Sequence, residues 1–219
     1  MKAQEALDTL AQQISVCTKC ELYKGRTHAV PGEGPTHAEI MLIGEGPGAN
    51  EDKQGRPFVG ASGKFLDELL SQAGVTRADV WITNVVKCRP PGNRDPEMVE
   101  IETCTTNYLD QQIKIVNPSI IVTLGRHSMS RFIPDAKITQ IHGQMQKIGK
   151  RFIIPMFHPA AALHNPTYLP HIKADFSKLP QLLDVARKEL AKTAPAVADP
   201  KTTYPVEEKK DEAKQMKLF

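Results

Sequence analysis

The 219 residues of this chain suffice for one substantial α/β domain, and its 40% hydrophobic and 24% charged content is ordinary for a globular protein. A formal net charge of +3 permits a polyanionic partner if basic residues cluster on one face, but does not demand one. No apolar run approaches the roughly 18 residues that a membrane span needs, and Glu5 and Asp8 argue against a signal peptide, so we expect an intracellular protein.

Apolar periodicity predicts alternating helices and strands along most of the chain. Asp95 and Pro96 are the expected cap and first residue of the central helix. In chain order, the predicted elements are a helix over 3–15, a strand over 38–44, a helix over 63–74, a strand over 79–86, a helix over 95–117, a strand over 118–125, a helix from about 126, a strand over 151–157 and a helix over 172–191. This alternation predicts an α/β fold with a parallel sheet covered on both faces.

The last part of the chain has a different composition. Residues 192–219 are rich in Pro, Lys and Glu and have almost no apolar periodicity. We therefore expect a single domain over residues 1–191, followed by a flexible charged tail over 192–219.

Polar residues gather where the predicted strands end. The four strand ends carry GEGPGA, TNVVKCRPPGNR, LGRH and HPAAALH. Ligands of open parallel sheets bind outside the carboxyl ends of the strands, so these segments predict a site at that edge.

The first of these segments also fits a dinucleotide-binding turn, as Gly44-x-Gly46-x-x-Ala49. Such a turn should lead directly into a helix, and the next strand should end in an acidic residue. Here a long polar loop is expected instead, and the next strand ends in Asn84. The nucleotide interpretation is therefore disfavoured, while glycines that serve only backbone geometry remain an alternative.

Three side chains at this edge suit a flat heterocycle that carries carbonyl groups. Phe58 lies in the turn GRPFVG, where an aromatic ring can stack on a planar ligand. Asn84 offers both a donor and an acceptor to an amide-like edge. His158 precedes Pro159 and can donate to a developing oxyanion. Taken singly, a loop anchor, a turn former and a structural histidine are the alternatives.

Four cysteines are too few for a disulfide scaffold but can hold a metal. Cys17 and Cys20 form a C-x-x-C pair, and Cys88 and Cys104 follow. Four-cysteine ligation suits either zinc or an iron–sulfur cluster, and the spacing does not choose between them. Four unrelated buried thiols, or a thioredoxin-like redox pair, are the weaker alternatives.

These segments together resemble a known family. GEGPGANEDKQGRPFVG, TNVVKCRPPGNR and HPAAAL look like the three signature segments, in order, of the iron–sulfur-containing, thermostable-type family 4 uracil-DNA glycosylases. The resemblance covers roughly residues 1–190. It implies the three-layer uracil-DNA glycosylase fold with a central four-stranded parallel sheet, and a [4Fe–4S] cluster held by the four cysteines.

The resemblance also implies an activity, namely hydrolysis of the N-glycosidic bond of deoxyuridine in DNA during base excision repair. Phe58 would stack on the flipped uracil, Asn84 would read its polar edge, and His158 would stabilise the charge on O2. The remaining implied residues are Glu45 and Glu51 for the attacking water and Gly46, Pro47 and Gly48 for the pocket wall. The group that activates the water is left open.

DNA contacts are predicted on weaker grounds. A base must leave the duplex to reach such a pocket, and Leu163 is a candidate wedge for the vacated space. Arg56, Lys87 and Arg89 flank the strand ends and are candidate phosphate contacts. Simple packing or an ordinary solvated charge is the alternative for each.

Further expectations concern partners and chemistry. A related branch is trapped covalently through a histidine in an inserted loop, and residues 90–104 lack such an insertion, so we predict a monofunctional hydrolase. Gln215-x-x-Leu218 followed by Phe219 resembles a truncated sliding-clamp-binding box, with a solvated tail as the alternative. We expect a cytoplasmic, nucleoid-associated monomer. The rival function is a non-enzymatic iron–sulfur protein that binds damaged DNA or transfers electrons.

Overall fold

The computed structural model describes residues 2–193, so the predicted tail from residue 194 onward, including the clamp-box resemblance, lies outside the described residues. Within them, no helix is long and apolar enough to cross a membrane. The strands are β1 (Ile40–Gly44), β2 (Val80–Asn84), β3 (Ile120–Leu124), β4 (Gln146–Ile148) and β5 (Arg151–Met156). The α-helices are α1 (Ala3–Ser15), α2 (Ala49–Gln54), α3 (Ala61–Gln72), α4 (Met98–Cys104), α5 (Asp110–Val116), α6 (Arg126–Ser130), α7 (Ile138–Ile141), α8 (Pro159–His164) and α9 (Leu169–Thr193).

The strands form one sheet in the order β2-β1-β3-β5-β4. The four predicted strands are all present and pair in parallel, and the register places Gly44 beside Asn84. β4 is an additional antiparallel edge strand that pairs with β5. It has only three residues, two of them exposed, which is too short for an alternating pattern to reveal it.

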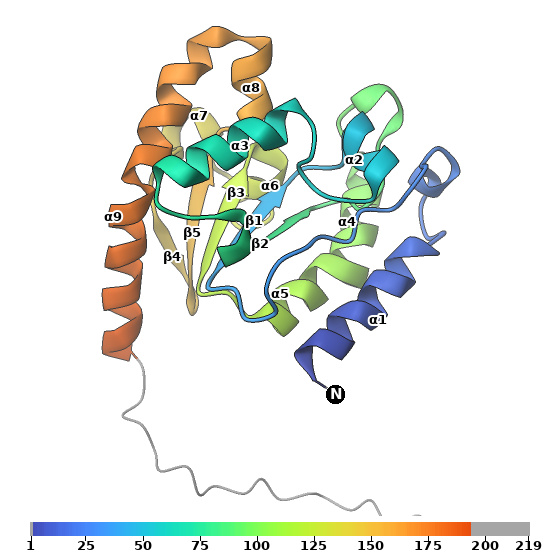
Figure 1. Ribbon diagram of the computed structural model, residues 1–219, viewed down its shortest axis with the longest axis horizontal. Coiled ribbons are helices and arrows are strands. Elements are labelled where there is room, and N and C mark those ends of the chain that lie inside the picture. The colour runs from blue at the N-terminus through green and yellow to red at the C-terminus, as the bar shows by residue number, and fades with distance from the viewer. Residues whose placement is uncertain (1, 194–219) are drawn as a thin grey trace, which may run out of the picture.

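The sheet is the middle of three layers (Figure 1). Alternate residues of each strand point to opposite faces, so Ile40 and Leu42 pack with α3 and α9, while Met41 and Ile43 pack with α1 and α5. Both faces are thereby buried, which is why the strands read as continuous apolar runs. The predicted α/β class with a parallel sheet between helical layers is confirmed.

The central helix begins later than predicted. Glu97, not Asp95, is its N-cap, and the Glu97 amide donates to Glu100 Oε2 over 2.7 Å. The Asp95 carboxylate instead accepts a hydrogen bond from Arg126, so it does not cap the helix. A π-helical turn, η4 (Thr105–Leu109), separates α4 from α5 and directly follows Cys104.

The prediction of a long polar loop after the first glycine turn is also wrong in part. Residues 49–54 form α2, with Gly48 as its N-cap and Gly55, where φ is 68°, as its C-cap. The sequence ANEDKQ has no apolar face, so periodicity could not reveal a helix this short.

The interface between α3 and the sheet gives a test of the packing. Leu66 is fully buried there, and Leu66→Ala should lower the free energy of unfolding by about 2–5 kcal/mol, because it removes apolar contacts and leaves a cavity. Glu68→Ala on the exposed side of the same helix is the matched control and should change it by less than about 0.5 kcal/mol. Equal effects in chemical denaturation would contradict this packing.

Candidate active site

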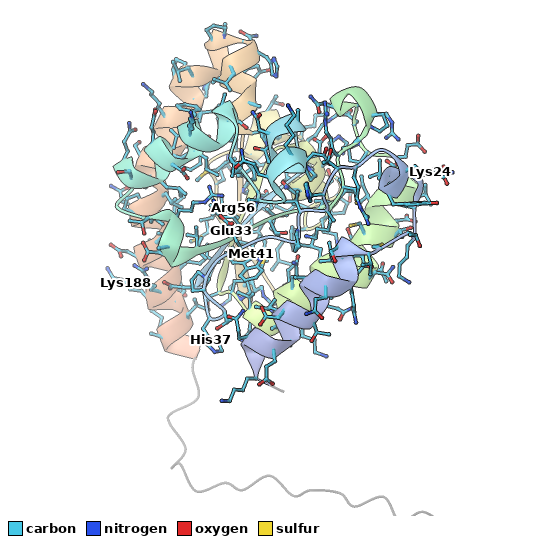
Figure 2. The ribbon with its side chains drawn as sticks, turned by 45° about the vertical axis from the view of Figure 1, so that its right-hand side comes forward. Lys24, Glu33, His37, Met41, Arg56 and Lys188 are labelled. Atoms are coloured by element: carbon cyan, nitrogen blue, oxygen red, sulfur yellow. The ribbon has the colours of Figure 1, made fainter. Side chains whose placement is uncertain are left out.

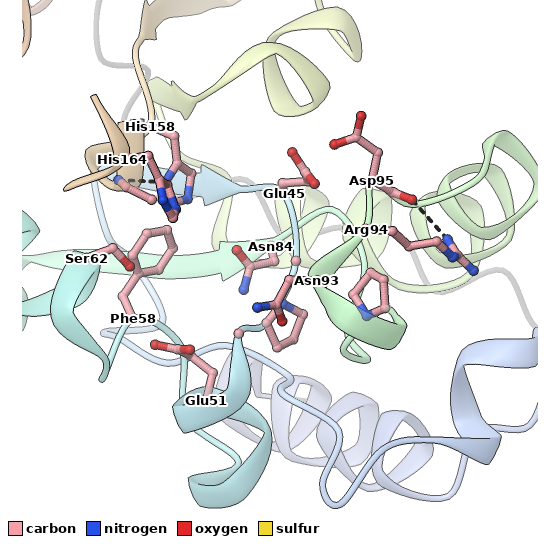
Figure 3. Close-up of a pocket in the computed structure, with 15 residues that line it drawn as sticks. Glu45, Glu51, Phe58, Ser62, Asn84, Asn93, Arg94, Asp95, His158 and His164 are labelled. Atoms are coloured by element: carbon pink, nitrogen blue, oxygen red, sulfur yellow. Dashed lines mark hydrogen bonds between the residues drawn. The ribbon is translucent and has the colours of Figure 1, made fainter. Parts of the chain in front are cut away.

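A cavity of about 440 Å³ lies at the carboxyl ends of the strands. Its walls come from the turn after β1, the end of β2, the segment before α4 and the start of α8 (Figure 3). The lining residues are Glu45, Gly46, Pro47, Gly48, Glu51, Phe58, Ser62, Asn84, Pro90, Asn93, Arg94, Asp95, His158, Ala160 and His164. Every residue predicted for base binding or for the water therefore contributes to one cavity.

Phe58 forms one wall of the cavity. Its backbone is left-handed, with φ of 51°, and its side chain is buried. Its ring lies 5.6 Å from the His158 ring between centroids, at 23° between planes. A Cβ atom at Gly63 would overlap the Phe58 carbonyl, so the turn requires glycine at that position. Glycine at position 63 thus permits the Phe58 turn, and the turn presents a face of the Phe58 ring to the cavity.

Asn84 ends β2 and projects into the cavity (Figure 3). The residue is 1% exposed, yet its Oδ1 atom has no hydrogen-bond partner within the protein. A Cβ atom at Gly44, opposite on β1, would overlap this oxygen and would lie 2.7 Å from Phe58 Cζ. Buried polar atoms are normally paired, so this orphaned acceptor indicates a ligand that brings a donor.

His158 is the N-cap of α8 and lies beside Phe58. Its Nδ1 accepts a hydrogen bond from the Ala160 amide over 3.1 Å, which places the ring proton on Nε2. Burial lowers the pKa of His158 to about 4, with Glu51 opposing the shift. The imidazole is therefore neutral near pH 7 and offers an Nε2–H donor.

Glu51 and Gly48 shape the floor of the cavity. The Glu51 Oε1 atom accepts the amides of Val59 over 2.9 Å and Gly60 over 2.7 Å, which fastens the Phe58 turn to α2. A Cβ atom at Gly48 would lie 2.7 Å from Glu51 Oε2, so a larger residue there would displace this carboxylate oxygen. Because this carboxylate lies at the start of α2, it leaves no favourable position for a pyrophosphate, in agreement with the disfavoured nucleotide interpretation.

Glu45 belongs to a small group of titratable side chains at the cavity rim. Its Oε2 atom lies 3.8 Å from His127 Nε2, which in turn lies 3.5 Å from Asp95 Oδ1. Burial raises the pKa of the Glu45 carboxyl, while His127 opposes the shift. His127 and Asp95 were not predicted as site residues. The available signal was the position of His127 in LGRH, directly after the β3 strand.

One of the four predicted DNA contacts is contradicted by the structure. Lys87 is 1% exposed, and its ammonium group donates to Thr83 Oγ1 and to the Asn84 carbonyl, each over 2.6 Å. Burial lowers the pKa of this lysine to about 8. A phosphate contact by Lys87 is therefore wrong, because the group holds the end of β2 from inside the protein.

The other three candidate DNA contacts lie on the surface. Arg56 is bound to Glu33, and Arg89 donates to Asn93 Oδ1 over 2.8 Å. Leu163 is 52% exposed on α8, next to the cavity residue His164. All three remain predictions.

The four cysteines are brought together, although the last lies 87 positions after the first in the chain. They line a second, small cavity between the end of α1, the segment after β2 and the end of α4: Cys17, Cys20, Cys88 and Cys104. All four thiols are free. In the part of the chain that the structure describes, no three of these sulfur atoms lie within 4.8 Å of one another.

Hydrogen-bond donors surround the same sulfur atoms. The Lys87 amide donates to Cys104 Sγ over 3.3 Å, and Arg26 Nη1 donates to Cys88 Sγ over 3.2 Å. Burial raises the pKa of the Cys104 thiol to about 12 and also raises that of Cys88. These thiols are protonated in the metal-free protein, and binding of a metal centre would release their protons.

Comparison with known proteins finds related sequences over most of the chain. Residues 31–184 match the model of the uracil DNA glycosylase superfamily. The chain is 47% identical over 188 residues to the type-4 uracil-DNA glycosylase of Sulfurisphaera tokodaii, covering 81% of this chain and 85% of that protein. It is 46% identical over 192 residues to the enzyme of that name from Saccharolobus solfataricus, covering 81% and 86%. The corresponding figures for Archaeoglobus fulgidus are 43% over 188 residues, covering 81% and 94%.

The state of His158 can be measured directly. We expect ¹⁵N-histidine NMR to show a neutral ring with the proton on Nε2 down to about pH 4, with the signal assigned by its loss in His158→Gln. The unfolded histidine titrates near pH 6.5, so between roughly pH 6.5 and 4 the unfolded state binds the extra proton and the free energy of unfolding falls as pH falls. A titration of this ring near pH 6.5 would contradict the structure.

Proposed function

The chain belongs to the uracil-DNA glycosylase superfamily and, within it, to the type-4 group, and on this premise we propose that it hydrolyses the N-glycosidic bond of deoxyuridine in DNA. The products are free uracil and an abasic site, which makes the enzyme a monofunctional DNA repair glycosylase. The proposal rests on the cavity at the strand ends, and each step below follows from one of its groups.

The orphaned Oδ1 atom of Asn84 carries the proposal. Uracil presents an N3–H donor beside the O4 acceptor, which complements the oxygen and nitrogen of one amide side chain. Cytosine presents an acceptor at N3, which would face the same buried oxygen without a proton between them. Because an unpaired buried acceptor is costly, this site favours uracil over cytosine.

Phe58 and His158 contact two other parts of the base, its flat face and its O2 atom. The Phe58 ring offers a face for stacking, which tolerates any base but contributes binding free energy. The neutral His158 imidazole donates from Nε2 to O2, where negative charge develops as the glycosidic bond breaks. A neutral donor suits this task, since it stabilises the uracil anion without transferring a full positive charge into a buried cavity.

Glu45 is the better candidate for holding the attacking water. Glu51 Oε1 already accepts two backbone amides, whereas the Glu45 carboxylate faces the cavity and contacts His127. Cleavage of the bond leaves an oxocarbenium-like sugar, which a weakly activated water can capture. Glu45 orients this water and stabilises the positive charge on the sugar, and Glu51 keeps the Phe58 turn in place.

The burial of Asn84 also implies base flipping. An amide that is 1% exposed at the end of a strand cannot reach the edge of a base inside a duplex. The deoxyuridine must therefore rotate out of the stack into the cavity, at a cost of a few kcal/mol that is smaller for single-stranded DNA. Leu163, exposed on α8 one residue before the cavity residue His164, is our candidate for the wedge.

We further propose that the four cysteines hold a [4Fe–4S] cluster. A single zinc ion with Zn–S bonds of about 2.3 Å draws its sulfur ligands to about 3.8 Å from one another. Among the described residues, no three of the four sulfur atoms lie within 4.8 Å of one another, which supports the larger centre. The hydrogen bonds that Lys87 and Arg26 donate to two of these sulfur atoms support it as well. When bound, the cluster would cross-link the segment after α1, the segment after β2 and the end of α4, with no ligand position left open.

The rival function, a non-enzymatic iron–sulfur protein, is disfavoured by the cavity. Damage binding alone requires the stacking ring and the amide, but not a neutral imidazole whose proton is directed by a backbone hydrogen bond. Electron transfer requires none of these groups.

The activity is tested by uracil release from an oligonucleotide with one deoxyuridine. We expect release by the wild type, and losses in the single-turnover rate of about 10²–10³-fold for His158→Ala and at least 10²-fold for Asn84→Ala. Lys64→Ala, on the exposed side of α3, is the control and should retain full activity. No release by cluster-replete wild type would overturn the function, and full activity of both site variants would overturn the site.

The cluster has a separate test that does not use activity. Protein purified without oxygen should be brown and contain about four iron and four sulfide ions per chain. Cys104→Ser should lower the iron content and the thermal midpoint, since a ligand of a closed site is lost. A colourless protein with one zinc ion per chain would contradict the proposal.

A further inference from the structure

The Phe58 turn is held by an arginine that lies outside the cavity. Arg77, in the 3-10 turn η2 (Arg77–Asp79) before β2, donates from Nη1 to the Phe58 carbonyl over 3.1 Å and from Nη2 to the Pro57 carbonyl. Its side chain is 23% exposed. One guanidinium thus binds two successive carbonyls at the point where the backbone enters the left-handed region, and its planar fork suits this paired contact.

The same guanidinium is anchored to the sheet through Glu33. Arg77 Nε donates to Glu33 Oε1 over 3.0 Å, and Arg56 donates to both oxygens of the same carboxylate, to Oε2 over 2.8 Å and to Oε1 over 3.0 Å. Arg56 and Glu33 are labelled in Figure 2. Although burial opposes ionisation, the hydrogen bonds from Arg56 and Arg77 lower the pKa of the Glu33 carboxyl. Glu33 therefore stays charged near neutral pH and keeps Arg77 in place.

Glu33 is itself fixed to the outer edge of β2. Its amide donates to the Ile82 carbonyl over 3.0 Å, and its carbonyl accepts the Ile82 amide over 2.8 Å. Glycines at 32 and 34 permit this approach, since a Cβ atom at Gly32 would lie 2.9 Å from the Ile82 carbonyl oxygen. Two residues beyond Ile82, the same strand ends at Asn84.

We infer that Glu33 and Arg77 form a clamp that sets the position of the Phe58 ring relative to Asn84, and that both are positioning residues of the glycosylase. The path is continuous: Phe58 carbonyl, Arg77 guanidinium, Glu33 carboxylate, Glu33 backbone, Ile82 backbone and the end of β2. The Phe58 ring and the Asn84 amide are thereby both held in position relative to β2. This inference rests on the proposed function, because the position matters only for a base held by both groups.

The clamp has a consequence for catalysis. A ring displaced by about 1 Å no longer stacks on a base whose edge Asn84 and His158 hold, and such misplacement costs on the order of 10²-fold. The loss should fall mainly on the rate at saturating substrate, since Arg77 is not among the residues predicted to contact DNA outside the cavity. A merely structural anchor would instead lower stability and leave the rate of the folded fraction unchanged.

The test compares Arg77→Met with Asp67→Asn. Asp67 accepts a hydrogen bond from the same guanidinium over 3.2 Å, and among the described residues this is its side chain's hydrogen bond, with none to residues 57–60. We expect Arg77→Met to lower the single-turnover rate about 10- to 100-fold and to change the DNA concentration for half-maximal rate less than about threefold. Asp67→Asn should stay within about twofold of wild type in both. Thermal midpoints confirm that each variant is folded.

A double-mutant cycle separates action through Phe58 from an independent effect. In a Phe58→Ala background, Arg77→Met should lower the rate by less than about threefold, because the ring that the clamp positions is already absent. Equal losses in both backgrounds would overturn the inference. Should Arg77→Met fail to fold, Glu33→Gln takes its place in the cycle, since it weakens the anchor and retains the guanidinium.

A spectroscopic readout is independent of activity. In protein labelled with 4-fluorophenylalanine, the ¹⁹F resonance of Phe58, assigned through Phe58→Leu, should shift or broaden in Arg77→Met and stay unchanged in Asp67→Asn. Inactive wild-type protein would overturn the proposed function and leave this readout to decide the clamp. Active wild type, with the rate and resonance unaffected in Arg77→Met, would overturn the clamp alone.

Discussion

The parallel pairing of β1 with β2 places Gly44 beside Asn84, and the cavity depends on the absence of a side chain at this contact. A Cβ atom at Gly44 would overlap Asn84 Oδ1 and crowd the Phe58 ring at once. The register of two strands thereby decides where the edge reader and the stacking ring meet. Other elements hold the groups around this contact. Glu51 of α2 and Arg77, which is bound to Glu33, hold the Phe58 turn. His158, at the start of α8, lies beside the Phe58 ring.

The charges around this contact suit a neutral heterocycle rather than a phosphate. Burial keeps His158 uncharged near pH 7, so the donor beside the Phe58 ring is a neutral imidazole rather than a cation. Lys87 is the one buried lysine of the described residues, and it is used to hold the end of β2 instead of contacting DNA. Discrimination then depends on hydrogen bonds to an extruded base, where an unmatched donor or acceptor is costly because water is excluded.

Several features of the site could be predicted because they depend on local pattern. Apolar runs predicted the four parallel strands, and the residue types in the segments after them predicted Phe58, Asn84 and His158, which the structure brings to one cavity. The errors concern features that local pattern does not encode. α2 has no apolar face, Asp95 binds Arg126 instead of capping a helix, and Lys87 is buried in a segment that reads as surface.

The sequence by itself determined the order of elements, the family, and the residue types at the ends of the strands, because periodicity and motif spacing depend only on near neighbours along the chain. Only the tertiary structure decided which of these residues meet. The clamp joins residues 33, 58 and 77, and the four cysteines come from three separate segments. Such contacts follow from the register of the strands and the crossing of the layers, and no local pattern carries them, because each depends on where the rest of the chain has folded.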